Sequence, residues 1–149
     1  MSNRRTMLTM TALHRAVLRL SGGRLGWSLG AMRVIELETV GRKSGERRRA
    51  MLTVPVEEGE RLVIIASRGG DDRMPAWYLN LEHEPRVGVA ERGGPARSYL
   101  ARTADPAERE RLWLLAVAAY RGYAAYQRKT EREIPVVILE PETPAAADR

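Results

Sequence analysis

The sequence predicts an α+β fold in which a mostly antiparallel sheet closes, or nearly closes, into a barrel with helices outside it. Two observations predict this fold. Short β-prone runs follow one another with glycine-containing turns between them, which is typical of hairpins. Segments with helical periodicity stand before, between and after these runs, so we expect helices to flank a sheet that is built from hairpins.

The composition limits the function classes. A chain of 149 residues with 44% apolar and 30% charged residues has the size and make-up of one globular domain. It contains no cysteine and two histidines, His14 and His83, which excludes disulfides, a cysteine nucleophile and thiolate metal sites, and we expect no metal site. No apolar run approaches the roughly 20 residues that span a bilayer, so the predicted location is the cytoplasm.

The positive charge is concentrated in the first third of the chain. Residues 1–49 carry 11 basic and 3 acidic side chains, a net charge of +8, whereas residues 50–149 carry 14 basic and 16 acidic ones, a net charge of −2. Candidate partners are a nucleic acid, an anionic membrane surface or a polyanionic small molecule. Few aromatic residues interleave with the basic ones, so we expect no nucleic-acid partner.

A first helix is predicted over residues 4–20. Its apolar side chains recur at steps of three and four residues while its arginines lie mostly on the other side. We expect this helix to cover the barrel end or the ligand groove, and weak peripheral association with a membrane is the alternative. Residues 24–33 are expected to be irregular, so residues 1–33 form an N-terminal helix and connector.

A hairpin with a strongly basic turn comes next. Residues 34–40 alternate between the two faces of a half-buried strand, and residues 51–56 form a second β-prone run. Two glycines frame the turn between them. Of the eight residues from Arg42 to Arg49, five are basic, so the turn would attract an anion. A solvated basic turn without a ligand is the alternative.

A second candidate site follows the most β-prone run, residues 61–66, which we expect to be a central strand. The loop over residues 67–74 contains two adjacent glycines, and its backbone N–H groups could cradle an anion, although a plain loop fits the pattern too. A proline then begins a short helix over residues 76–81. Strands over residues 86–90 and 96–101 follow.

The last part of the chain contains a second long helix. Asp105-Pro106 supplies its N-cap and first residue, and the helix is expected to run to about Gln127. A strand over residues 134–139 follows, and residues 142–149 are expected to be a disordered tail. Residues 34–141 are therefore expected to form the barrel domain.

Three tyrosines recur every third residue near the end of this second long helix: Tyr120, Tyr123 and Tyr126. On one helix they would cover a face about 120° wide. Such a wall of phenols suits a flat aromatic ligand, and a helix face that packs on the barrel is the alternative.

Taken together, these segments resemble the deazaflavin (F420)-dependent nitroreductase and quinone reductase family, from about Glu38 to Pro141. The order and separations of the motifs are specific to that family. The motifs are Thr39-Val40-Gly41-Arg42-Lys43-Ser44-Gly45, Ala66-Ser67-Arg68-Gly69-Gly70, Pro75-Ala76-Trp77-Tyr78-Leu79-Asn80-Leu81, Pro85-Arg86-Val87, Trp113, the three tyrosines and Ile134-Pro135-Val136.

The resemblance implies a split β-barrel with flanking helices that uses reduced F420 to reduce a quinone, nitroaromatic or enone-type acceptor. It implies that the basic turn holds the phosphate and the acidic glutamyl tail of F420. The cofactor-binding residues carried over are Arg42, Lys43, Ser44, Arg48, Ala66, Ser67, Arg68, Gly69, Gly70, Trp77 and Tyr78. The catalytic residues on the acceptor side are Ser67, Tyr120, Tyr123 and Tyr126.

A deazaflavin carries the hydride itself, so the chain needs neither a nucleophile nor a metal. Hydroxyl groups of Ser67 and the tyrosines could donate to the acceptor oxygen. We expect Tyr123 to be the first candidate donor, Tyr126 the next, and Tyr120 the most buried of the three. Two positions depart from the family pattern: Ala50-Met51-Leu52 stands where Asn-Pro-Leu is common, and Arg68 replaces a lysine.

Two alternatives remain at this level. One is a split-barrel oxidoreductase that uses FMN, and the other is a carrier that binds F420 without turnover. The five cations near Gly41 favour a longer anionic tail than FMN has.

Overall fold

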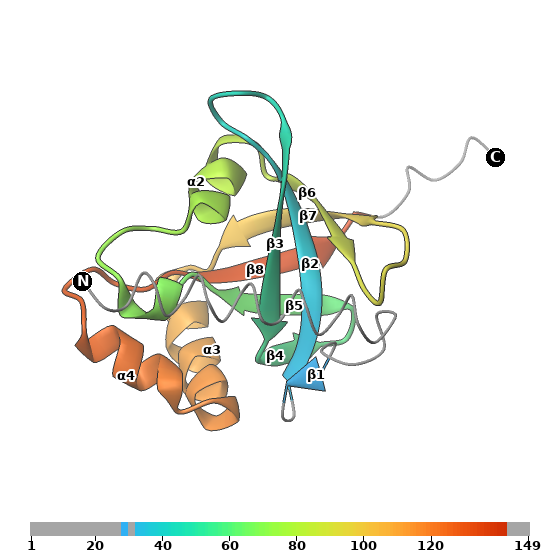
Figure 1. Cartoon of the computed structure of the whole chain (residues 1–149). Coiled ribbons are helices and arrows are strands. Elements are labelled where there is room, and N and C mark those ends of the chain that lie inside the picture. Colours follow the sequence, from blue (N-terminus) through green and yellow to red (C-terminus); the bar gives the residue numbers. More distant parts are fainter. Residues whose placement is uncertain (1–27, 30–31, 143–149) are drawn as a thin grey trace.

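The computed structural model describes residues 28–29 and 32–142 (Figure 1). The expected first helix, residues 4–20, lies outside these ranges, and so does the expected tail apart from Glu142. Within them eight strands form one sheet: β1 (Ser28–Leu29), β2 (Met32–Val40), β3 (Arg47–Val54), β4 (Val56–Glu58), β5 (Arg61–Ile65), β6 (Arg86–Ala90), β7 (Arg97–Thr103) and β8 (Val136–Pro141). The helices are a 3-10 turn η1 (Arg68–Gly70), α2 (Ala76–His83), α3 (Pro106–Ala119) and α4 (Gly122–Arg128).

The sheet is antiparallel at every pairing between these strands, as predicted. Its strand order is β1-β2-β6-β7-β8-β5-β4, and β3 also pairs with β2. The sheet curls so far that β3 comes close to β5, which gives the split barrel seen in Figure 1. The predicted fold class is confirmed.

Alternation along the strands divides the apolar residues between two cores. In β5, Leu62 and Ile64 point into the barrel, where α2 closes the core with Leu81. Val63 and Ile65 point outward and are covered by α3 and α4. The barrel therefore carries α2 at one end of its interior and α3 with α4 on its outer face (Figure 1).

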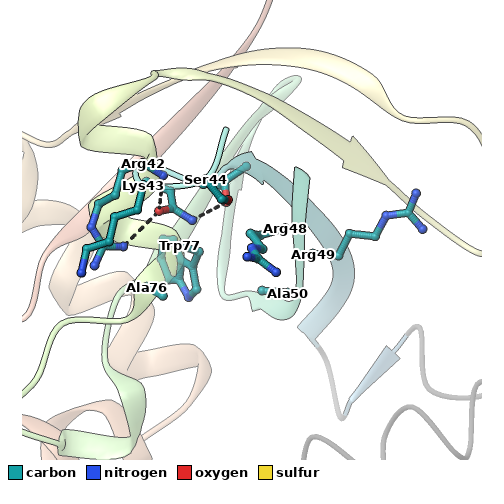
Figure 2. Close-up of a pocket in the computed structure, with 11 residues that line it drawn as sticks. Arg42, Lys43, Ser44, Arg48, Arg49, Ala50, Ala76 and Trp77 are labelled. Atoms are coloured by element: carbon teal, nitrogen blue, oxygen red, sulfur yellow. Dashed lines mark hydrogen bonds between the residues drawn. The ribbon is translucent and has the colours of Figure 1, made fainter. Parts of the chain in front are cut away.

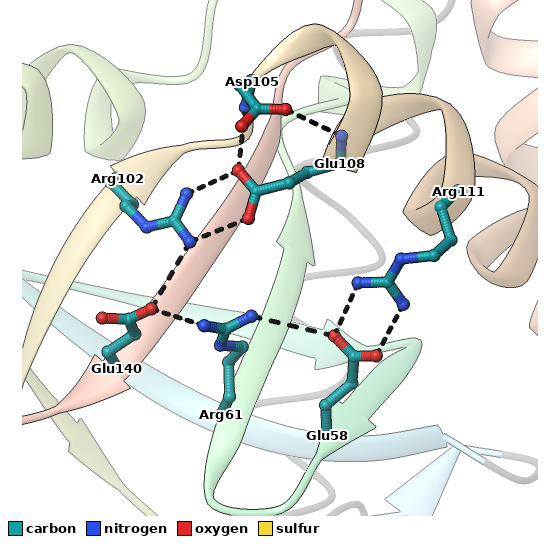
Figure 3. Close-up of polar contacts among 7 residues, drawn as sticks. All are labelled: Glu58, Arg61, Arg102, Asp105, Glu108, Arg111 and Glu140. Atoms are coloured by element: carbon teal, nitrogen blue, oxygen red, sulfur yellow. Dashed lines mark hydrogen bonds and ion pairs between the residues drawn. The ribbon is translucent and has the colours of Figure 1, made fainter.

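A network of ion pairs fastens α3 to the barrel (Figure 3). Asp105 caps the helix as predicted, and Glu108 N donates to Asp105 Oδ1 at 2.8 Å. Arg102 on β7 donates to both oxygens of Glu108 at 2.7 and 2.8 Å, and Arg111 reaches Glu58 on β4 at 2.6 Å. These hydrogen bonds from Arg102 lower the pKa of Glu108 from 4.5 to about 2.

Several elements differ from the prediction. The run expected over residues 51–56 is part of two strands, because β3 begins already at Arg47 and ends at Val54, and β4 follows Pro55. The segment expected to be irregular contains β1 and the start of β2, which begins at Met32. The last strand begins at Val136, two residues later than predicted. The second long helix is two helices, because α3 ends at Ala119 and α4 begins at Gly122.

The helix break has a local cause. The backbone of Tyr120 is extended, with φ −149° and ψ 106°, and its ring folds back over Gly122. A Cβ on residue 122 would lie 2.4 Å from that ring, so a larger residue there would displace the Tyr120 ring from this position. The continuous tyrosine stripe predicted from helical spacing is therefore wrong.

None of the helices in the described ranges is both long and apolar enough to cross a membrane.

Candidate functional site

A groove of about 340 Å³ lies between the β2–β3 hairpin and α2 (Figure 2). Basic side chains from the hairpin turn face an aromatic side chain from the helix across it. Its lining residues are Thr39, Gly41, Arg42, Lys43, Ser44, Arg48, Arg49, Ala50, Ala76, Trp77 and Asn80. The structure thus brings together four residues predicted from the basic turn with Trp77.

The turn that carries the cations is tightly closed. Gly41 N donates to Glu46 O at 2.7 Å, and Gly45 N donates to Gly41 O at 2.8 Å. A Cβ on residue 41 would lie 2.7 Å from Ser44 Oγ, and Gly45 has φ +71°, so both positions require glycine. Since Ser44 Oγ accepts from Glu46 N at 3.1 Å, its own hydrogen stays available for a ligand.

Asn80 joins this turn to α2. Its side chain is buried, and its Oδ1 accepts from Arg42 N at 3.2 Å and from Arg42 Nη1 at 3.1 Å. Its Nδ2 donates to Thr39 Oγ1 at 3.2 Å. Asn80 therefore fixes both the backbone and the guanidinium of Arg42. Sequence reasoning missed this role, because the two partners of Asn80 lie 38 and 41 residues away in the chain.

The three arginines at the start of β3 divide between its two faces, whereas Arg42 and Lys43 lie in the turn before it. Arg47 lies 2.8 Å from Glu38, and Arg49 lies 3.5 Å from the same carboxylate. The register places Arg49 opposite Glu38 and Arg48 opposite Thr39, so Arg48 takes the groove face. Figure 2 shows Arg49 pointing away from Arg48.

Four cations line the groove, and three of them, Arg42, Lys43 and Arg48, present their charge to it. The fourth, Arg49, contacts Glu36 and Glu38 instead. Of the three, Arg48 has an exposed contact with Glu46 at 3.3 Å. The argument from five cations for a long anionic tail is therefore corrected to an argument from three.

The loop of residues 66–70 lies against α4. Ala66 and Ser67 are buried, and the backbone turns through positive φ at Arg68, Gly69 and Gly70. A Cβ on residue 70 would lie 2.7 Å from the backbone oxygen of Tyr126, so this glycine allows the close approach. The Arg68 side chain is directed to its own loop, where Nη1 donates to Met74 O at 3.4 Å.

The three predicted tyrosines form one cluster although their helix is broken. The ring centroids are 5.1 Å apart for Tyr120 and Tyr123, and 6.2 Å apart for Tyr120 and Tyr126. The hydroxyls of Tyr120 and Tyr126 are 3.2 Å apart, and that of Tyr123 is 3.0 Å from Thr53 Oγ1 on β3. Sequence reasoning also missed this contact of Thr53.

The burial of these tyrosines is the reverse of the prediction. Tyr123 is 5% exposed and Tyr120 is 40% exposed. Tyr120 was expected to be the most buried, but the helix break turns it outward. Burial raises the pKa of Tyr123, and burial together with the Tyr120 hydroxyl raises the pKa of Tyr126 to about 12. Both phenols therefore keep their protons at neutral pH and can donate.

Tyr78 lies behind the groove. Its ring belongs to the interior core, and its hydroxyl is 2.9 Å from Thr103 Oγ1. It meets Trp77 edge to face at a centroid distance of 6.3 Å. Trp77 therefore faces the groove, and Tyr78 supports it from within the barrel.

The candidate site thus has two parts, connected by β3. Arg48 contributes to the groove, and Thr53, five residues further along the same strand, contacts the tyrosine cluster. Five residues of strand span roughly 17 Å. Because Arg48 and Thr53 are an odd number of residues apart, they project from opposite faces of β3, so a ligand that contacts both parts of the site would have to cross the edge of this strand.

A family model described as F420H2-dependent quinone reductase matches residues 10–141. The match begins well before Glu38, where the resemblance begins in the sequence. The chain is 37% identical over 132 residues to the F420H2-dependent quinone reductase Rv1261c of Mycobacterium tuberculosis, with 85% of this chain and 87% of that protein covered.

Two solved structures are also similar to this chain in sequence and fold. A structure described as an F420-H2 dependent reductase (FDR-A) is 42% identical with a TM-score of 0.62, over 72% of this chain and 93% of that chain. A second, described as a domain-swapped dimer, is 37% identical with a TM-score of 0.65, over 89% and 98% of the two chains.

Proposed function

The chain belongs to the F420H2-dependent quinone reductase family, and from this premise we propose that it transfers a hydride from reduced coenzyme F420 to a quinone. The observation that carries the proposal is the groove between the hairpin and α2. It combines three cations on the groove side, a glycine-framed turn and an aromatic wall. These features fit a ligand with a flat ring and an anionic tail.

The anionic part of F420 binds at the hairpin. Arg42 offers a planar guanidinium that Asn80 already holds in place, and Lys43 offers a mobile point charge. Ser44 and Arg48 complete the set with a hydroxyl donor and a second guanidinium. Because charge-assisted hydrogen bonds to phosphate and carboxylate are strong, these four residues account for recognition of the phosphate and the glutamyl tail.

Trp77 and the loop of Ala66, Ser67, Arg68, Gly69 and Gly70 would hold the ring of F420. Reduced F420, when bound, supplies the hydride. The contribution of the protein is to hold that ring close to the acceptor and to exclude water. Tyr78 acts indirectly, by keeping Trp77 in place.

The acceptor binds beside the tyrosine cluster. Tyr120 and Tyr126 carry the accessible pair of hydroxyls, and Ser67 lies in the loop that packs on the same helix. These hydroxyls donate to the acceptor oxygen as negative charge develops there. Tyr123 is the least accessible donor, since it is buried on Thr53. Nitroaromatic and enone acceptors would use the same donors.

Titration of the purified protein with F420 and with FMN, followed by fluorescence quenching, tests the cofactor assignment. We expect F420 to bind more tightly than FMN because its tail carries additional carboxylates for Arg42, Lys43 and Arg48. Equal or tighter binding of FMN, or FMN retained through purification, would favour the FMN-dependent oxidoreductase instead.

We further propose that the cofactor-binding domain begins by residue 28, earlier than the expected residue 34, because β1 and the start of β2 belong to its sheet, and that the preceding residues form an accessory segment. Binding to anionic vesicles at physiological salt tests whether the basic N-terminal third adds a membrane contact. We expect weak binding, and strong binding would assign this segment to a membrane surface.

A further inference from the structure

Arg132 lies outside every motif that carried the sequence analysis, yet it makes the densest set of hydrogen bonds near the site. It stands in the connector between α4 and β8. Its Nε donates to Asp71 O at 2.8 Å, its Nη2 to Ser67 O at 2.8 Å and its Nη1 to Ala66 O at 3.2 Å. One guanidinium therefore donates hydrogen bonds to three backbone carbonyl oxygens of a single loop.

The loop itself needs such a partner. Arg68, Gly69 and Gly70 all have positive φ, a conformation that is unfavourable for Arg68 in particular. Carbonyls that are turned inward by this path must be paired, because an unpaired buried carbonyl is destabilising. Arg132 donates to Ala66 O and Ser67 O where β5 ends and to Asp71 O after η1. Ser67 O also accepts from Gly70 N at 2.9 Å, so for this carbonyl Arg132 adds a second hydrogen bond.

The connector that carries Arg132 is tied in turn to the tyrosine helix. Gln127 on α4 donates from Nε2 to Arg132 O at 2.8 Å and accepts from Ile134 N at 2.9 Å. Thr130 donates to Asp72 Oδ1 at 2.8 Å. Arg132 and its connector therefore fix the position of the loop that contains Ser67 relative to α4, which contains Tyr126.

We propose that Arg132 is a positioning residue for hydride transfer: it fixes the Ser67 loop relative to α4, so that the ring and the acceptor are held in reacting geometry. The proposal rests on the proposed function. A misplacement of about 1 Å can reduce a rate about 100-fold, so a loosened loop should affect turnover much more than binding. The anionic tail, which is held by the hairpin, should bind almost as before.

The test uses Arg132→Lys, which keeps the charge but offers one compact head in place of a planar fork. Arg109→Lys is the matched control: its guanidinium donates to Ile134 O at 2.9 Å, on the same connector, and its other partners are Gln127 and Glu133 rather than the loop. The first measurement is amide hydrogen exchange of residues 66–73 in the cofactor-free proteins. We expect faster exchange there in Arg132→Lys and unchanged exchange in Arg109→Lys.

The second measurement is steady-state kinetics with reduced F420 and a water-soluble quinone. We expect kcat to fall about 10- to 100-fold in Arg132→Lys while the Kd of F420 changes less than about threefold. Unchanged loop exchange, or a kcat loss equal to that of Arg109→Lys, would overturn the proposal. If Arg132→Lys does not fold, Thr130→Val removes a different hydrogen bond between the same connector and loop, from Thr130 to Asp72, and should give smaller changes in the same direction.

The exchange measurement also distinguishes failure of the Arg132 proposal from failure of the proposed quinone reductase function. A wild-type protein without quinone reduction would refute the proposed function. In that case the exchange rates of the loop would still decide whether Arg132 holds it.

Discussion

Replacement of Arg42 and Lys43 by alanine should weaken F420 binding strongly, because these two cations face the groove. A hydrogen bond to a charged group contributes about 1.5–3 kcal/mol. Both side chains are exposed, so the lower end of that range applies, and the double variant should lose about 3 kcal/mol. That loss corresponds to roughly a 100-fold higher Kd.

Two exposed arginines outside the groove offer a matched control. Arg47→Ala with Arg97→Ala removes the same charge, but Arg47 pairs with Glu38 and Arg97 with Glu60, and neither lines the groove. Their loss should raise the Kd less than about fivefold, through the general field alone. Fluorescence titration at physiological salt measures both values. Equal losses in the two double variants would show that F420 responds to net charge and not to contacts in the groove.

Two further predictions concern the acceptor side and the scaffold. Tyr126→Phe should lower kcat/KM about 10- to 1000-fold, which is roughly 1.4–4 kcal/mol of transition-state stabilisation. Tyr123→Phe should chiefly lower stability, because the Tyr123 hydroxyl is hydrogen-bonded to Thr53. Wild-type kinetics for Tyr126→Phe would remove Tyr126 from the acceptor site. Thermal stability should fall as the pH is lowered from about 4.5 towards 2. The pKa of Glu108 is lowered in the folded state, so the ionised Glu108 side chain stabilises the fold fully above its unfolded-state pKa. This stabilisation is lost as the pH falls through about 2. Glu108→Gln should flatten that slope while keeping the capping box, and a melting-temperature series against pH with an unchanged slope would contradict this account.

Local signals account for what the sequence predicted well. Alternation in residues 34–40 and the Asp105-Pro106 start of α3 each depend on neighbouring residues, and the structure confirms both. The glycine-framed turn was predictable for the same reason, since Gly41 and Gly45 occupy positions that exclude a Cβ or require positive φ.

Long-range contacts account for most of what it missed. One miss is local: the ring of Tyr120 folds onto Gly122, two residues away, at the break before α4, and this arrangement overrides the helical spacing of the tyrosines. The partners of Asn80 and Arg132 lie 38 to 66 residues away in the chain, so no local pattern indicates them. The division of the three arginines at the start of β3 depends on the β2–β3 register, which sets Arg49 against Glu38.

The central claim is most directly tested by oxidation of reduced F420 in the presence of a quinone. Absorbance of the oxidised deazaflavin should rise only when protein, reduced F420 and quinone are all present, with one equivalent of quinone reduced for each equivalent of F420 oxidised. Tight binding of reduced F420 without oxidation by any quinone, nitroaromatic or enone acceptor would contradict the account and would identify the protein as a carrier.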